Sequence, residues 1–175
     1  MTETAETTGA RDHGLRLREP AHRVSPRAVP YWTVQALIVH TIVLAVASTV
    51  YFTLLPERWW WTTVIYGLLA LQALVDVLVK PRVRYAVHRW EVTPTAVVAR
   101  RGWLTREQRI APLSRVQTVD SLRGALMRMF DLASITVTTA SAAGPVSIDC
   151  VDSATAERVV AELTEITGRD EGDAT

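Results

Sequence analysis

Cysteine is nearly absent from this chain, because Cys150 is the only one among 175 residues. A single thiol can form neither a disulfide within the chain nor a cysteine-rich metal site. Nothing in the cysteine content therefore indicates an oxidising compartment. We expect Cys150 to be a small buried apolar residue.

The residue patterns of common catalytic and metal centres are also missing. The chain has no glycine-rich loop of the phosphate-binding kind and no Ser, His and Asp arrangement in recognisable surroundings. Its histidines lack metal-ligand spacing and are scattered: His13, His22, His40 and His88. We predict a non-enzymatic protein with no catalytic residues, no metal and no cofactor.

Apolar residues are plentiful, at 49% of the chain, and they gather in two blocks, residues 31–55 and 59–79. Each block is as long as the roughly 20 residues that a helix needs to cross a bilayer. Only residues 56–58 separate the blocks, which predicts a tight transmembrane helical hairpin. The sequence "AVAS" at 45–48 could indicate signal cleavage, but the apolar run continues past it.

Aromatic and cationic residues at the ends of the blocks give an expected orientation. Tyr31 and Trp32 begin the first block and a run of three tryptophans, residues 59–61, begins the second, as expected where a span meets the headgroups. Cations flank the two outer ends, whereas the connecting loop has only Arg58. The positive-inside rule then predicts a multi-pass inner-membrane protein with both termini cytoplasmic.

Four polar side chains fall inside the apolar blocks, where they are costly. Asp76 precedes Lys80 by four residues and is expected to pair with it. Hydrogen bonds are expected to join the others to the second helix or to the helices of a partner. The four intramembrane polar residues are Gln35, His40, Gln72 and Asp76. No ladder of acids or histidines indicates a transport path.

The ends of the chain are polar. Residues 1–30 are rich in Thr, Glu, Arg and Pro, and we predict a disordered cytoplasmic tail and linker. Residues 169–175 are predicted to form a second disordered tail.

After the second block the hydrophobic pattern becomes that of strands. Residues 82–93 alternate as a half-buried strand does, and residues 95–113 predict two strands joined by a turn at Gly102. Residues 134–140 and 144–151 predict another pair. The final segment predicts a helix whose apolar face is Ala156, Val159, Val160, Leu163 and Ile166. The whole describes a membrane α+β protein, with a bent sheet or barrel capped by a C-terminal helix.

Two segments between these strands admit more than one interpretation. In "RIAPLSRVQTV", residues 109–119, Pro112 cannot donate a ladder hydrogen bond. The segment is either a corner that buries Leu113 or a binding surface. In "DSLRGALMRMFDLASI", residues 120–135, the apolar residues are expected to pack into the core: Leu122, Leu126, Met129 and Phe130.

Charge is divided unevenly along the second half of the chain. Residues 80–128 carry a net charge of +8, whereas residues 129–175 carry −7. Anionic headgroups attract each nearby Lys or Arg by about 1 kcal/mol. An ordinary solvated face, partly paired with the acidic half, is the alternative. The candidate lipid- or partner-binding residues are Lys80, Arg82, Arg84, Arg100, Arg101, Arg106, Arg109 and Arg115. Nucleic acid is not expected, since a bilayer already lies beside these cations.

Three motifs resemble the YdbS-like bacterial membrane proteins, which carry a pleckstrin-homology-like (PH-like) domain. They are "RRGWL" at 100–104, "IAPLSRVQTV" at 110–119 and "ALMRMFDLASITV" at 125–137, in that order after the hairpin. The resemblance covers about residues 20–167. It implies a seven-stranded, strongly bent sheet capped by the C-terminal helix in residues 80–168, and no known reaction.

Two functions follow from these observations and the resemblance. The first is an interaction or scaffold module that assembles with another membrane protein, which the resemblance suggests is a larger one with similar PH-like domains. The alternative is a module that binds anionic phospholipid headgroups at the inner leaflet. The intramembrane polar residues favour the first, and the basic segment favours the second.

Overall fold

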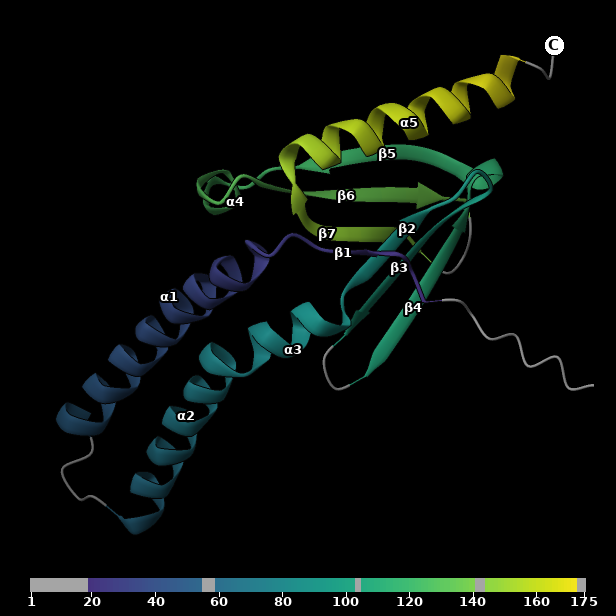
Figure 1. Cartoon of the computed structure of the whole chain (residues 1–175). Helices are drawn as coiled ribbons and strands as arrows, with labels where there is room; N and C mark the ends of the chain where they lie inside the picture. Colours follow the sequence, from purple (N-terminus) through teal and green to yellow (C-terminus); the bar gives the residue numbers. More distant parts are fainter. Residues whose placement is uncertain (1–18, 55–58, 103–104, 141–143, 173–175) are drawn as a thin grey trace, which may run out of the picture.

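The computed structural model describes residues 19–54, 59–102, 105–140 and 144–172. Helices α1 (Ala28–Thr49) and α2 (Trp60–Leu78) lie side by side and extend away from the strands (Figure 1). A π-helical turn, Val50–Leu54, follows α1. Both helices are long and apolar enough to cross a membrane, and their outer faces are exposed. The predicted hairpin is therefore confirmed, while its connecting loop lies outside the described residues.

The aromatic residues at the helix ends behave in two ways. Trp59, Trp60 and Trp61 are exposed near the start of α2, as a headgroup layer requires. Trp32, in contrast, is only 5% exposed and packs against His88, with ring centroids 5.5 Å apart. The prediction that Trp32 marks a membrane surface is wrong, because the region after α2 covers this end of α1.

Helix α3 (Lys80–Val87) continues almost directly from α2 and corrects the strand predicted over residues 82–93. The backbone between the two helices stays in the right-handed helical region. Pro81 suits the first helical turn, where its missing N–H breaks no hydrogen bond. Val83 and Val87 are four residues apart, so a run that alternates also forms a helical face. Only its second half becomes a strand.

Seven strands form two antiparallel sheets, with orders β1-β2-β3-β4 and β5-β6-β7. The strands of the two sheets cross steeply (Figure 1), and the described strands form no closed barrel. The predicted bent sheet with a C-terminal cap is thus confirmed. The strands are β1 (His22–Arg23), β2 (Arg89–Val92), β3 (Ala96–Gly102), β4 (Arg106–Pro112), β5 (Val116–Leu122), β6 (Leu132–Thr139) and β7 (Val146–Asp152).

Strand β1 lies in the segment predicted to be a disordered linker, which corrects that prediction for residues 19–30. His22 and Arg23 pair with the first residues of β2. Ser25 then donates its backbone N–H to the carbonyl of Cys150 at 3.0 Å and its hydroxyl to Asp152 at 2.8 Å. The start of α1 is therefore fixed to both sheets. Residues 1–18 lie outside the described part of the chain.

The chain passes from the first sheet to the second at a 3-10 turn, Leu113–Arg115. Leu113 is 3% exposed and donates its backbone N–H to the carbonyl of Thr95 at 2.9 Å. Pro112 ends β4, where no further ladder bond is needed. The segment from 109 to 119 is thus the corner between the sheets.

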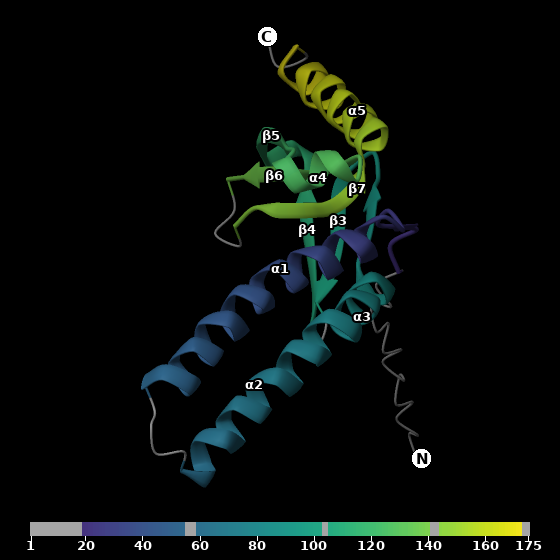
Figure 2. The ribbon, with the colours of Figure 1, turned by 90° about the vertical axis from the view of Figure 1, so that its left-hand side faces the viewer.

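The core lies between the two sheets and under helix α5 (Ser153–Gly172), as Figures 1 and 2 show. The helix runs past Gly168, so the predicted C-terminal tail begins too early. The predicted apolar face is largely correct, since Ala156, Val159 and Leu163 are buried. Cys150 is buried as expected, on a bulge of β7 where its φ is +55°.

Helix α4 (Ala125–Met129) differs from the prediction for this segment. Met127 and Phe130 pack against the core. Leu122 and Met129, however, are 66% and 80% exposed, so they are not core residues. The helix is little more than one turn long, and only one side of it can meet the sheet.

Leu163 provides a test of this core. It lies on the inner face of α5 and is fully buried, so Leu163→Ala should lower the free energy of unfolding by about 2 to 5 kcal/mol through lost contacts and a new cavity. Glu162→Ala, at the exposed neighbouring position, should change it by less than about 0.5 kcal/mol. Chemical denaturation of the full-length chain in detergent measures both. Equal effects would mean that α5 does not cap the core.

Candidate membrane-interface site

Asp76 joins the two membrane helices at the end of the hairpin nearest the sheets. One carboxylate oxygen lies 3.4 Å from Nε2 of His40 on α1, and the other lies 3.4 Å from Nζ of Lys80. The Nδ1 atom of His40 is 2.9 Å from the carbonyl oxygen of Ala36, which can only accept, so Nδ1 donates. The predicted pairing of Asp76 with Lys80 is present, and His40 extends it to the other helix.

Two further hydrogen bonds join α1 and the π-helical turn after it to α2. The Ser48 hydroxyl lies 2.9 Å from that of Tyr66, and the Tyr51 hydroxyl lies 2.9 Å from that of Thr63. The sequence analysis missed these residues, because weakly polar hydroxyl side chains are common in apolar helices. The available signal was their i, i+3 spacing, which puts Ser48 and Tyr51 on one helical face and Thr63 and Tyr66 on another.

The two glutamines do not join the helices. Gln72 is exposed on α2 and has no hydrogen-bond partner among the described residues. Gln35 is also exposed, but it lines a groove beside His40. The predicted set of four thus separates into a cluster around Asp76 and one isolated outward residue, Gln72.

Arg84 of α3 connects the hairpin to the second sheet. Its guanidinium carbon lies 4.4 Å from the centre of the Trp32 ring, a cation–π contact. Its Nη2 atom is 3.6 Å from a carboxylate oxygen of Asp149 on β7. This half-exposed ion pair is worth only about 1 kcal/mol or less. The main role of Arg84 is therefore to position α1, α3 and β7 relative to one another, and its contribution to stability is small.

His88 lies behind Arg84 and is only 5% exposed. Its Nδ1 donates to the carbonyl of Arg84 at 2.9 Å, and its Nε2 faces Nε of Arg84 at 3.4 Å. Burial, and then the charge of Arg84, lower the pKa of His88 to about 4. The neutral imidazole can accept from the guanidinium, so His88 orients Arg84 without adding charge.

Two adjoining surface grooves meet at Lys80 and Arg84. One, of about 280 Å³, lies between α1 and the α2–α3 junction and includes Gln35, His40 and Asp76. The other, of about 490 Å³, continues toward the β3–β4 hairpin and includes Arg101 and Glu107. We call Lys80, Arg84 and Arg101 the basic groove. It follows the end of the hairpin, where a membrane surface would lie.

Carboxylates partly neutralise the positive charge of the basic groove. Glu107 accepts from Nε of Arg109 at 2.6 Å and from Nε of Arg101 at 3.2 Å. The hydrogen bonds from Arg109 and then Arg101 lower the pKa of Glu107, so it stays ionised. With Asp76, two carboxylates face three cations. The groove therefore suits one anionic group rather than a strongly anionic surface.

The other predicted cations do not join this groove. Arg100 bonds to Glu19 at 2.9 Å, and Arg109 also donates to the carbonyl of Pro145 at 3.2 Å. The Arg82 guanidinium bonds to the carbonyl of Leu78, the last residue of α2. Arg115 is exposed at the corner between the sheets, and the Arg106 side chain lies outside the described part. Three of the eight predicted residues thus form one site: Lys80, Arg84 and Arg101.

A larger hollow of about 530 Å³ lies between β1, β2 and α5. Arg23 and Arg158 face it together with Asp152 and Glu162, so neither sign of charge prevails there. Within the described ranges, no group of three or more His, Cys, Asp or Glu residues could hold a metal ion. The basic groove is therefore the site that the predicted residues and the geometry share.

Comparisons with known proteins agree with this architecture. A family model described as a bacterial PH domain matches residues 24–167, which include the hairpin. The UPF0699 transmembrane protein YdbS of Bacillus subtilis is 29% identical over 159 residues, covering 87% of this chain and 98% of that protein. No solved structure matches.

His88 gives the site a pH dependence that can be measured. Its pKa is 6.5 in an ordinary setting and about 4 when folded, so below pH 6.5 the unfolded chain binds a proton that the folded chain does not. The free energy of unfolding should fall as the pH drops toward 4, with up to about 3 kcal/mol due to His88. His88→Gln should flatten this fall in detergent denaturation. His22→Gln, at an exposed position, is the control, and an equal effect of both variants would contradict the assignment.

Proposed function

This chain belongs to the bacterial PH domain family, and we propose that it is a non-enzymatic membrane protein whose PH-like domain and hairpin assemble with another membrane protein. Like its Bacillus subtilis relative, which is named a transmembrane protein, it carries apolar helices suited to a bilayer. The cations at the outer ends of the hairpin favour a cytoplasmic location for both termini and for the domain in the inner membrane.

Gln72 is the observation that carries this proposal. Leu68 and Ile65, one and two helical turns earlier on the same face, are 59% and 50% exposed, so this face meets lipid or another helix. A carboxamide in hydrocarbon lacks hydrogen-bond partners, which a polar side chain of a neighbouring helix supplies. Such a bond is worth about 0.6 to 2 kcal/mol. Gln72 thus favours a partner helix on this face.

The pairing of the basic residues supports the same proposal. Arg100 is held by Glu19, Arg101 by Glu107 and Arg84 by Asp149, all within 3.6 Å. Cations that are neutralised within the chain attract anionic lipid weakly over distance. A broad electrostatic contact with the bilayer is therefore less favoured than a specific protein contact.

A second candidate function is the binding of one anionic phospholipid headgroup in the basic groove. Lys80 lies at the end of α2, and its amino group is bonded only at its Asp76 side among the described residues. Arg84 and Arg101 line the same opening. A phosphate there would have three cationic donors at the level of the headgroups.

The partner-helix proposal predicts face-specific crosslinking. A photo-crosslinking amino acid at position 72 should form an adduct with a protein in the native membrane, because this face meets the partner. The same amino acid at position 74, which is 54% exposed on the opposite face, is the control. Mass spectrometry identifies each adduct. Lipid adducts alone, or the same protein adducts from both positions, would overturn the proposal.

The headgroup alternative predicts a loss of lipid on Lys80→Gln. Native mass spectrometry of the full-length chain from mixed bilayers should show anionic lipid retained about fivefold less than by the unaltered chain, since a surface cation contributes about 1 kcal/mol. Arg115→Gln, outside the groove, is the matched control. The full chain is required, because parts of the domain come from the chain before and within the hairpin. Strand β1 precedes α1 and pairs with β2, and Trp32 of α1 packs against His88. Equal retention by both variants would reject the headgroup site.

A further inference from the structure

Helix α4 and the end of β5 present apolar side chains to the outside of the domain. Met129 is 80% exposed and Leu122 is 66% exposed, the two largest values for a large apolar side chain among the described residues outside the hairpin. Ala125 is exposed between them. The opposite side of α4 is anchored, because Met127 and Phe130 pack against the core. The segment is therefore a firmly held projection rather than a loose loop.

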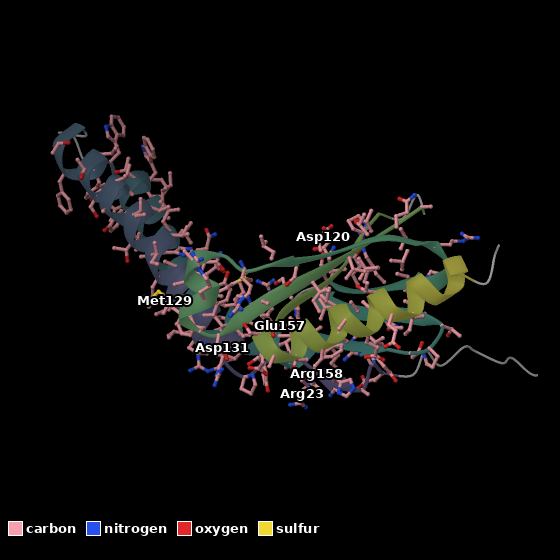
Figure 3. The ribbon with its side chains drawn as sticks, turned by 90° about the horizontal axis from the view of Figure 1, so that it is seen from above. Arg23, Asp120, Met129, Asp131, Glu157 and Arg158 are labelled. Atoms are coloured by element: carbon pink, nitrogen blue, oxygen red, sulfur yellow. The ribbon has the colours of Figure 1, made fainter. Side chains whose placement is uncertain are left out.

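The position of this projection relates it to the membrane helices. The ring of Phe130 packs edge-on against Tyr31 in the first turn of α1, with centroids 6.1 Å apart. Arg27, just before α1, pairs with Asp131 at 2.9 Å. Figure 3 shows Met129 beside the hairpin, whereas Glu157 and Arg158 lie over the sheets on α5. The projection thus lies where the first span begins.

The charges around the projection suit the surface of a bilayer. Arg128 is exposed on α4 and makes no ion pair among the described residues. Arg123 stays near the domain, 3.6 Å from Asp131 and 3.7 Å from Glu157. Exposed apolar tips beside an unpaired cation are typical of segments that enter the boundary between headgroups and acyl chains. The projection thus combines two exposed apolar side chains with an unpaired cation.

We infer that Leu122 and Met129 insert into the same bilayer that the hairpin spans, as a second contact between the domain and the membrane. Because Phe130 packs against Tyr31, the surface of this projection is continuous with the surface of α1. The hairpin alone would let the domain tilt, and a second contact on one flank fixes its orientation. This contact is separate from the basic groove and from the Gln72 face.

Site-directed spin labelling of the full-length chain in bilayers tests the inference. Cys150 is 2% exposed, and burial raises the pKa of its thiol to about 12, so an added cysteine can be labelled selectively. Labels at Met129→Cys and Leu122→Cys are compared with Leu74→Cys, exposed on the face of α2 opposite Gln72, and with Ala161→Cys, exposed on α5. Accessibility to oxygen marks lipid, and accessibility to a water-soluble nickel complex marks water.

We expect the labels at 129 and 122 to show an oxygen-to-nickel ratio near that at 74 and severalfold above that at 161. Met129→Asp should move the label at 122 toward the value at 161, whereas Met129→Leu should not. Two outcomes would overturn the inference. One is free access of nickel to both labels, and the other is protection from both reagents with strong immobilisation, which would indicate a protein on this surface.

Discussion

The hydrogen bonds that precede the first membrane helix fix the arrangement of everything that follows it. β1 pairs with β2, and the backbone N–H of Ser25 bonds to the carbonyl of Cys150 on β7. These contacts hold the start of α1 against both sheets, while α3, which packs against β3, holds the end of α2. With both ends held, the hairpin and the domain act as one body. The groove at their junction and the position of α4 beside α1 are results of that constraint.

Arg84 shows how a charge can be placed at this junction without a large cost. Its side chain is 35% exposed, so the guanidinium keeps part of its hydration while it contacts Trp32 and Asp149. Full burial of such a pair would cost more in lost hydration than the attraction returns. His88 supplies an acceptor on the buried side and remains neutral, which avoids a second buried charge. The positive and negative charges at the junction therefore nearly balance. Lys80, whose amino group contacts only Asp76 among the described residues, is the cation most available to a ligand.

Much of the architecture could be predicted from the sequence, because strong local patterns determine it. The two apolar blocks, the hairpin of β3 and β4 and the apolar face of α5 follow from period and length alone. β1 could not be predicted, since two residues carry no period and pair with a strand far along the chain. The strand predicted where α3 forms was wrong, because Val83 and Val87 fit both the strand period and the helix period. Continuity with α2 makes this segment a helix. The prediction that Met129 packs into the core was wrong, because a sequence pattern does not show where a sheet ends.

The candidate site was predictable only in part, for a related reason. Charge counts identified a basic segment, but they could not show that Glu19 and Glu107 neutralise much of it, as each pairing depends on the folded register. The i, i+4 spacing correctly predicted the ion pair between Asp76 and Lys80. The approach of His40 depends on how two helices pack, which no spacing within one helix determines.

The pairing of β1 with β2 also has a consequence for how the protein is made. The two strands lie on either side of the hairpin in sequence, yet they share one ladder, so any insertion of the chain into a bilayer would have to cross it an even number of times between them. A single crossing would leave the partners on opposite sides. The ladder can close only after the second helix has entered the membrane and β2 has left the ribosome. A hairpin that failed to return would leave the first sheet without its edge strand.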